Sequence, residues 1–189
     1  ENLRNEVEGK IVLFDVPFTT YGETVQYRYG GASAAAKHGA VASVIRSITP
    51  FSMNTPHTGG MSYDEEIIKI PHAALTLEDA SLIHRIQDLG EEVPVIRLYM
   101  EAHFEKDSPS RNIIAELKGT EFPDEIIVLG GHIDSWDVGQ GAHDDAGGCV
   151  AAWEAVRILK KLGLRPRRTL RVVMWTNEEY GLRGGKNYR

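Results

Sequence analysis

The side chains best able to carry out chemistry gather in three short segments of the C-terminal half. They are one imidazole and five carboxylates: His132, Asp134, Asp144, Asp145, Glu178 and Glu179. Their spacing allows them to converge at the ends of two strands and the start of one helix. One imidazole with several carboxylates is the kind of ligand set that a pair of hydrolytic zinc ions needs.

His132 and Asp134 stand two residues apart in a segment expected to be a strand. Side chains at such positions point to the same face, so the Asp134 carboxylate can orient the imidazole. Taken alone, a His-x-Asp pair is more often a surface or structural pair than a metal site. The acidic residues that follow are what give the pair a functional interpretation.

Asp144 and Asp145 follow about ten residues later, at the start of an expected helix. Helix capping explains one carboxylate at this position but hardly two, preceded by the glycine-rich run Gly139-Gln140-Gly141. A carboxylate shared between two dications lowers their mutual repulsion and leaves room for a bridging hydroxide. A bridging metal ligand therefore explains the pair better.

Glu178 and Glu179 follow a hydrophobic strand-like run at its C-terminal end, where open α/β sheets collect their sites. Adjacent carboxylates repel each other unless a positive charge lies between them. One interpretation is a solvated loop. The other makes Glu179 a zinc ligand and Glu178 the acceptor of the proton of the attacking water.

Other catalytic motifs fit the chain poorly. A dinucleotide fingerprint would need a third glycine where Asp144 stands, so no nucleotide cofactor is expected. Ser135 lies outside any Gly-x-Ser-x-Gly elbow, which argues against a serine hydrolase. His143 flanks the capping turn and is left out of the ligand set.

The second half predicts an α/β arrangement. We expect strands over 112–117, 126–131 and 169–176 and a long helix over 145–162. In this helix, apolar residues recur at intervals of three and four positions and should pack on the sheet: Cys149, Val150, Trp153, Val156, Leu159 and Leu162. Cys149 and Trp153 are expected to be core residues, with Cys149 unreactive.

The first half predicts a second α/β unit. Strands are expected over 10–14, 41–45 and 93–99, and helices over 29–38 and from Thr76, the capping residue, to the position before Gly90. A loop is expected around 21–22, and a long surface loop over 49–63. The polar segment Asp107-Ser108-Pro109-Ser110 is the best linker, so we predict a boundary between units 1–107 and 108–189.

Composition excludes several classes of protein. The formal net charge of -6, without a cluster of Lys or Arg, argues against a nucleic-acid partner. No stretch approaches the roughly 20 apolar residues of a membrane helix, so no membrane partner is expected. Cys149 is the single cysteine, so the chain cannot form an internal disulfide.

The ordered motifs Gly-Gly-His132-Ile-Asp134, His-Asp144-Asp145-Ala-Gly-Gly and Asn-Glu178-Glu179 resemble the co-catalytic dizinc aminopeptidase and carboxypeptidase family. The resemblance implies an α/β fold, in which a protease-associated domain (1–107) precedes the N-terminal part of a mixed-sheet α/β/α exopeptidase domain (108–189). It also implies hydrolysis of short peptides, especially dipeptides with free termini. A secreted or lysosomal location and a possible homodimer belong to the same expectation.

The resemblance also assigns roles. Two Zn²⁺ ions would be bound, one by His132 and the other by Glu179, with Asp144 bridging both. Glu178 would be the general base for a zinc-activated water, and Asp134 would orient His132. Asp145, behind the ligands, would follow Asp144 through a cis peptide bond.

The family uses one further Asp and one further His downstream of the Glu-Glu pair, and the chain supplies neither before Arg189. We therefore expect this sequence to be the middle of a longer dizinc peptidase. The alternative is a truncated, non-catalytic binding or scaffold module of the same family.

Overall fold

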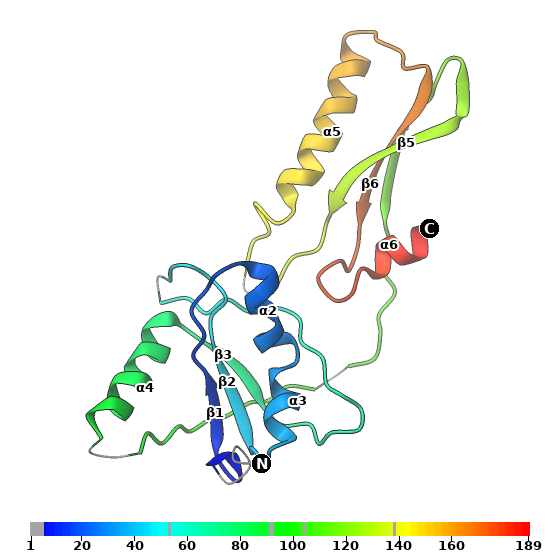
Figure 1. Cartoon of the computed structure of the whole chain (residues 1–189). Helices are drawn as coiled ribbons and strands as arrows, with labels where there is room; N and C mark the ends of the chain where they lie inside the picture. The colour runs from blue at the N-terminus through cyan, green and yellow to red at the C-terminus, as the bar shows by residue number, and fades with distance from the viewer. Residues whose placement is uncertain (1–5, 53, 91–92, 104, 138) are drawn as a thin grey trace. The chain divides into compact units, whose positions relative to one another are not determined.

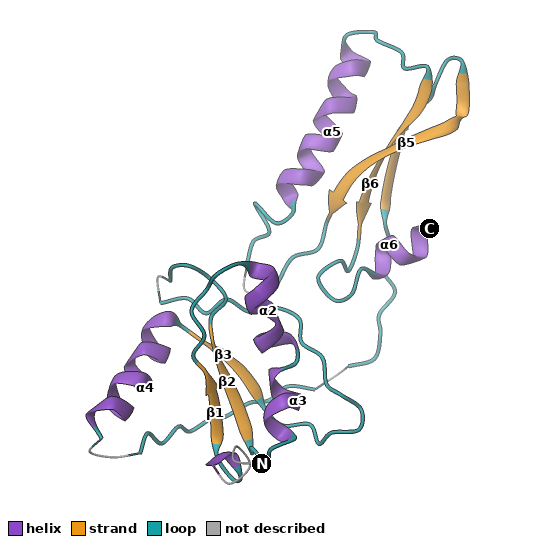
Figure 2. Cartoon of the chain, in the orientation of Figure 1, coloured by secondary structure: helices purple, strands orange, loops and turns teal. Residues whose placement is uncertain are grey.

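Two three-stranded sheets, one in each half of the chain, organise the fold (Figure 1). The computed structural model describes residues 6–52, 54–90, 93–103, 105–137 and 139–189. The chain divides into two compact units, Glu1–Phe104 and Glu105–Arg189. Both units combine helices with strands, which confirms the predicted α/β class (Figure 2). The division falls three residues before the predicted boundary.

The first unit is built on a parallel sheet. Its strands are β1 (Ile11–Phe14), β2 (Ala42–Arg46) and β3 (His72–Leu75), and they lie in the order β1-β2-β3. Helix α4 (Leu77–Leu89) begins after Thr76, whose hydroxyl accepts the N–H of Asp79 at 3.0 Å. It ends at Gly90, which is left-handed. The predicted helix bounds are confirmed.

The loop predicted around residues 21–22 is wrong, because helix α2 (Tyr21–Tyr29) occupies this segment. Thr20 caps the helix by accepting the N–H of Glu23 at 3.3 Å, while the Glu23 carboxylate accepts the Thr20 hydroxyl. This spacing of Thr and Glu was the signal for a helix start. The chain then bends at Gly30, so the predicted helix over 29–38 is reduced to α3 (Gly31–Ala36).

The strand predicted over 93–99 is also wrong, since the structure gives these residues no regular secondary structure. Val93 and Val95 are 83% and 94% exposed. Pro94, between them, lacks the N–H that a paired strand would donate. The β-branched side chains favoured a strand in the sequence, but within the described residues this segment pairs with no sheet.

The second unit contains a mixed sheet. Strands β4 (Ile113–Leu117), β5 (Phe122–His132) and β6 (Arg168–Trp175) lie in the order β4-β6-β5. The central strand β6 is antiparallel to β4 and parallel to β5. Helices α5 (Ala146–Lys161) and α6 (Arg183–Tyr188) complete the unit. No helix among the described residues is long and apolar enough to cross a membrane.

Helix α5 packs on β5 and β6 through only part of its apolar stripe. Cys149 and Ala152 are buried against Val172 and Met174, so the prediction for Cys149 is confirmed. Trp153 is 54% exposed, and two further stripe residues, Val150 and Leu162, are exposed as well. The prediction that these three are packed on the sheet is wrong.

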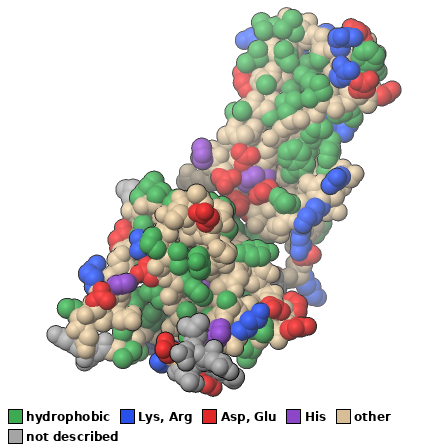
Figure 3. Space-filling model, in the orientation of Figure 1, with side chains coloured by type: hydrophobic (Ala, Val, Ile, Leu, Met, Phe, Trp, Pro, Cys, Tyr) green, Lys and Arg blue, Asp and Glu red, His purple; other side chains and the backbone are tan. Residues whose placement is uncertain are grey.

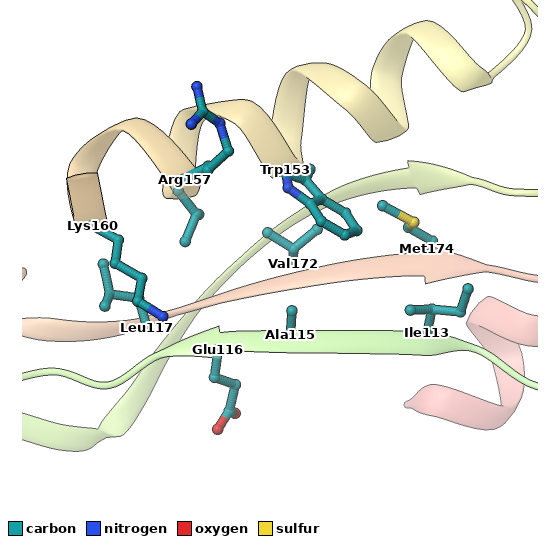
Figure 4. Close-up of a pocket in the computed structure, with 10 residues that line it drawn as sticks. Ile113, Ala115, Glu116, Leu117, Trp153, Arg157, Lys160, Val172 and Met174 are labelled. Carbon is teal, nitrogen blue, oxygen red and sulfur yellow. The ribbon is translucent and has the colours of Figure 1, made fainter.

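Strand β4 is the edge strand on the side of α5 that carries Trp153, and no strand lies beyond it among the described residues. An apolar groove of about 290 Å³ opens there, and Trp153 lies above Val172 on its floor, with Ile113 and Ala115 on the edge strand (Figure 4). Hydrophobic side chains are also visible on the surface of this unit in the space-filling view (Figure 3).

Candidate metal centre

The parallel pairing of β5 and β6 brings two functional loops to one edge of the sheet. His132 at the end of β5 is in register with Trp175 at the end of β6. The next peptide continues the pairing, since the N–H of Ile133 donates to the carbonyl of Trp175 at 2.8 Å. The loops that carry Asp134 and Glu178-Glu179 therefore begin side by side, as the strand-end argument predicts.

Three of the predicted residues converge at this edge. His132, Asp144 and Glu179 each offer one ligand atom, and these atoms all lie within 4.8 Å of one another. His132 Nε2 is 2.8 Å from Asp144 Oδ1. The His132 side chain is 11% exposed and that of Asp144 73%, so the cluster sits at the surface with a largely buried imidazole.

His132 is oriented through its other ring nitrogen. Nδ1 lies 2.8 Å from the backbone carbonyl of Asp134, which can only accept, so Nδ1 carries the proton. The Asp134 carboxylate lies 3.6 Å away, beyond hydrogen-bond distance. Asp134 thus orients the imidazole through its carbonyl instead of the side chain that the His-x-Asp pattern suggested, because β5 ends at His132.

The Asp134 carboxylate has a different task, which the sequence did not reveal. Its two oxygens accept the backbone N–H groups of Glu178 at 2.9 Å and Glu179 at 3.2 Å. Asn177, in the left-handed conformation with φ 54°, turns the chain just before them. Asp134 therefore hydrogen-bonds to the imidazole of His132 and to the backbone of both glutamates.

Asp145 supports the centre from behind. One carboxylate oxygen caps α5 by accepting the N–H of Gly148 at 3.0 Å, and the other accepts the N–H of His132 at 3.1 Å. A Cβ at Gly131 or Gly148 would collide with this carboxylate, so both glycines are needed for its close approach. The peptide bond between Asp144 and Asp145 is cis, as the resemblance implies.

The electrostatics of the cluster suit a cation. Burial and the neighbouring Asp144 carboxylate raise the pKa of Glu179, although His132 opposes this effect. Burial lowers the pKa of His132, but the Asp134 carbonyl and the carboxylates of Asp144 and Glu178 outweigh it and raise the pKa overall. A divalent ion would relieve the repulsion between the carboxylates.

The donor set fits zinc chemically. It offers one imidazole nitrogen and two carboxylate groups, and His₂Glu-type sets of nitrogen and oxygen are typical of catalytic zinc sites. Nδ1 of His132 donates to the Asp134 carbonyl, which leaves Nε2 free for a metal ion. Such a hydrogen bond fixes the tautomer of metal-binding histidines. These residues can therefore hold the ion that the spacing predicts.

Nearby nucleophilic and imidazole groups take no part in this donor set. Cys149 is buried, and its Sγ lies 3.2 Å from the His132 carbonyl. Burial and the negative charge of Asp145 raise the pKa of the thiol, which keeps it protonated and unreactive. His143 is exposed.

Glu178 faces a small cavity beside the cluster. Its Oε2 lies 3.8 Å from His132 Nε2. The cavity, of about 250 Å³, is lined by His132 and Glu178 together with Trp175 and Leu182. Two aromatic residues of the same loops, Trp136 and Tyr180, were not predicted from the sequence, and their rings are in contact. Their positions two residues after Asp134 and directly after Glu179 were the available signal.

Comparison with known proteins assigns the second unit to a family. Residues 112–189 match the model of peptidase family M28. These residues belong to peptidase family M28. The match confirms the family resemblance of the motifs around His132, Asp144 and Glu178.

Similarity extends over both units of the chain. Carboxypeptidase Q of Xenopus laevis is 50% identical over 187 residues, which are 99% of this chain and 40% of the relative. A crystal structure of a peptidase M28 precursor from Shewanella amazonensis aligns with a TM-score of 0.91 at 41% identity, covering 98% of this chain and 44% of that one.

A zinc aminopeptidase from Bacillus subtilis shares the fold, with a TM-score of 0.59 at 23% identity, covering 97% of this chain and 40% of that one. The chain spans about two fifths of the length of each of these proteins.

Proposed function

We propose that this chain carries the metal-binding part of a zinc metallo-exopeptidase that hydrolyses short peptides, in particular dipeptides with free termini. The observation that carries the proposal is the convergence of His132, Asp144 and Glu179 within 4.8 Å. The 50% identity to a protein named carboxypeptidase Q supports the peptide substrate.

In this proposal His132 would bind one zinc ion, Glu179 would bind a second, and Asp144 would be shared by both. Asp144 suits a bridging role because one carboxylate oxygen faces His132 while most of the side chain is open to solvent. Bound zinc supplies a water of lowered pKa and an electrophile for the peptide carbonyl.

Glu178 is the proposed general base. Its carboxylate lies beside His132 Nε2 at 3.8 Å without being part of the three-residue cluster, so it remains free to accept a proton. It would take the proton of the attacking water and then deliver it to the amine of the leaving group, which for a dipeptide is the C-terminal amino acid. Asp134 would keep Glu178 in place through the backbone hydrogen bond at 2.9 Å.

The remaining parts of the proposal concern the whole protein. Residues 1–107 would form a protease-associated domain, and 108–189 the first part of the dizinc exopeptidase domain. The protein would be secreted or lysosomal and could form a homodimer. The further Asp and His ligands of the family would come from outside these 189 residues.

The test uses the protein as its source organism produces it. Its intact mass is compared with the 21.0 kDa of this chain, and dipeptide hydrolysis is measured with and without zinc. We expect a heavier species whose hydrolysis requires zinc and is abolished by Glu178→Gln without loss of bound metal. A species of 21.0 kDa that binds peptides without cleaving them would instead support the non-catalytic alternative.

A further inference from the structure

A small cavity lies beside the proposed general base. It has a volume of about 250 Å³, and its lining comes from the ends of β5 and β6, the loop after β6 and helix α6. Pockets that enclose a whole small molecule measure roughly 300–1,000 Å³. This cavity is smaller, so it suits one side chain of a ligand whose remaining atoms lie outside it.

The residues around the cavity favour an apolar occupant. Trp175 and Leu182 are its large apolar residues, Glu178 and Asp145 are its acidic ones, and the described part of the chain adds no Lys or Arg to the lining. An apolar side chain gains free energy when it leaves water for such a surface. A carboxylate would instead be repelled by the two acids.

Leu182 has a backbone conformation that leucine rarely adopts. Its φ is 61°, in the left-handed region that glycine or asparagine enters at lower cost. The side chain is 50% exposed, so burial in a core does not offset this strain. Strained residues of this kind gather at functional sites, where the side chain itself is needed. The cavity that Leu182 lines is therefore the better explanation for a leucine at this position.

Backbone hydrogen bonds fix Leu182 relative to Glu178. The N–H of Leu182 donates to the carbonyl of Glu178 at 2.9 Å, and the N–H of Gly181 donates to the same carbonyl at 3.1 Å. The next residue, Arg183, donates its N–H to the carbonyl of Asn177 at 3.1 Å. The apolar wall of the cavity and the proposed base thus belong to one tightly closed loop.

Trp175 and Gly185 shape another part of the cavity. The ring of Trp175 contacts that of Tyr188 on α6, with 6.4 Å between the ring centroids and 82° between the planes. Gly185, also on α6, has no side chain, and a Cβ there would lie 4.0 Å from its nearest neighbour, Trp175 Cδ1. A larger residue at position 185 would therefore occupy space beside Trp175.

The role of Glu178 decides which part of a substrate would enter. Glu178 would deliver its proton to the amine of the leaving amino acid, so that amino acid must lie beside Glu178 during the reaction. Because Glu178 and Leu182 line the same cavity, the side chain next to the leaving amine is the one that reaches it.

We propose that this cavity is the subsite for the side chain of the leaving, C-terminal residue of a dipeptide, and that Leu182 is the residue that makes it select apolar side chains. The inference rests on the proposed function, because it requires hydrolysis at the metal centre with Glu178 as the base. It adds a substrate class: dipeptides with an apolar C-terminal residue.

The first test removes the Leu182 side chain. Three dipeptides that share the N-terminal residue and end in Leu, Ala or Glu are hydrolysed by the zinc-loaded protein as its source organism produces it. We expect kcat/KM to be highest for the peptide ending in Leu and lowest for the one ending in Glu. Leu182→Gly should lower kcat/KM for the peptide ending in Leu about 10-fold, with little change for the peptide ending in Ala. Leu164→Gly is the matched control, because Leu164 is 52% exposed in the loop after α5.

The second test fills the cavity. Gly185→Leu should shift the preference from the peptide ending in Leu toward the one ending in Ala, because the added side chain takes up the space beside Trp175. Gly22→Leu on α2 is its control, since a Cβ at Gly22 has no atom within 4 Å. The preference should be the same in this control and in the unaltered protein.

Thermal unfolding and zinc content are measured for each variant. Leu182→Gly removes a strained residue, so its thermal stability should not fall. A loss of stability with an unchanged preference would show that Leu182 supports the fold instead, and would overturn the inference. So would a Gly185→Leu variant with an unaltered preference, or a preference of the unaltered protein for the peptide ending in Glu. In each of these results dipeptide hydrolysis persists and the proposed function stands, whereas failure of the unaltered zinc-loaded protein to cleave any of the peptides would overturn both.

Discussion

The carboxylate of Asp134 accepts the backbone N–H of Glu178 at 2.9 Å, so the loop after β5 fixes a position in the loop after β6. The second oxygen accepts the N–H of Glu179, and the carbonyl accepts His132 Nδ1. Asp134 therefore connects the proposed general base and two proposed ligands without touching the ion. Its substitution should disturb the whole centre.

Asp134→Asn is expected to weaken zinc binding about 10- to 100-fold. The amide offers one acceptor oxygen where the carboxylate has two, and its NH₂ would face the N–H of one glutamate. Zinc titration of the purified protein, as its source organism produces it, measures the effect. Asp137→Asn is the matched control, since Asp137 is an exposed acid of the same loop. Equal affinities for the Asp134 variant and the unaltered chain would contradict the connecting role.

Two adjacent glycines should respond oppositely to alanine. At Gly148 a Cβ would collide with the Asp145 carboxylate, whereas at Gly147 the nearest atom is 3.7 Å away. Gly147→Ala should therefore raise the free energy of unfolding by about 0.5–1 kcal/mol, because alanine favours the helix. Gly148→Ala should lower it and also weaken zinc binding. Urea unfolding of both variants measures these changes. Stabilisation by Gly148→Ala would contradict the prediction, because the Asp145 carboxylate could then move aside without loss of stability.

The stability of the first unit should fall in mild acid because of two histidines, His57 and the buried His72. Burial and the charge of Arg28 lower the pKa of His57. Burial likewise lowers the pKa of His72, although its hydrogen bond with Ser43 opposes the shift. The unfolded chain then binds more protons than the folded one, so stability is complete above pH 6.5 and is lost as the pH falls below it.

Each histidine can contribute a slope of up to about 1.4 kcal/mol per pH unit over this window. Hydrogen exchange of the β2 amides between pH 7.5 and 5.5, corrected for intrinsic rates, measures it without interference from the second unit. His57→Gln should reduce the slope, and His38→Gln, at an exposed position, should not. A slope that is the same in all three proteins would contradict the assignment to His57.

The sequence was most informative where several independent patterns predicted the same element. The strands ending at His132 and Trp175, and the helix beginning after Asp145, could be predicted because apolar periodicity, caps and catalytic spacing coincide there. The convergence of His132, Asp144 and Glu179 follows from these elements once β5 and β6 are parallel neighbours.

Tertiary contacts decided the rest. Whether Val93 and Val95 joined a sheet depended on a partner strand that local composition cannot reveal. The exposure of Trp153 depends on where the sheet ends, at β4. The contacts of Asp134 with Glu178 and Glu179 bridge positions 44 and 45 residues apart, so no local pattern contains them.

The central claim is that His132, Asp144 and Glu179 together hold zinc, and zinc titration of the protein as its source organism produces it tests this claim most directly. The account predicts saturable binding that is lost when His132 is replaced by Ala or Glu179 by Gln, and that persists in the control His143→Ala. Zinc binding as strong in the His132 and Glu179 variants as in the unaltered protein, or no zinc binding by the unaltered protein, would contradict the claim.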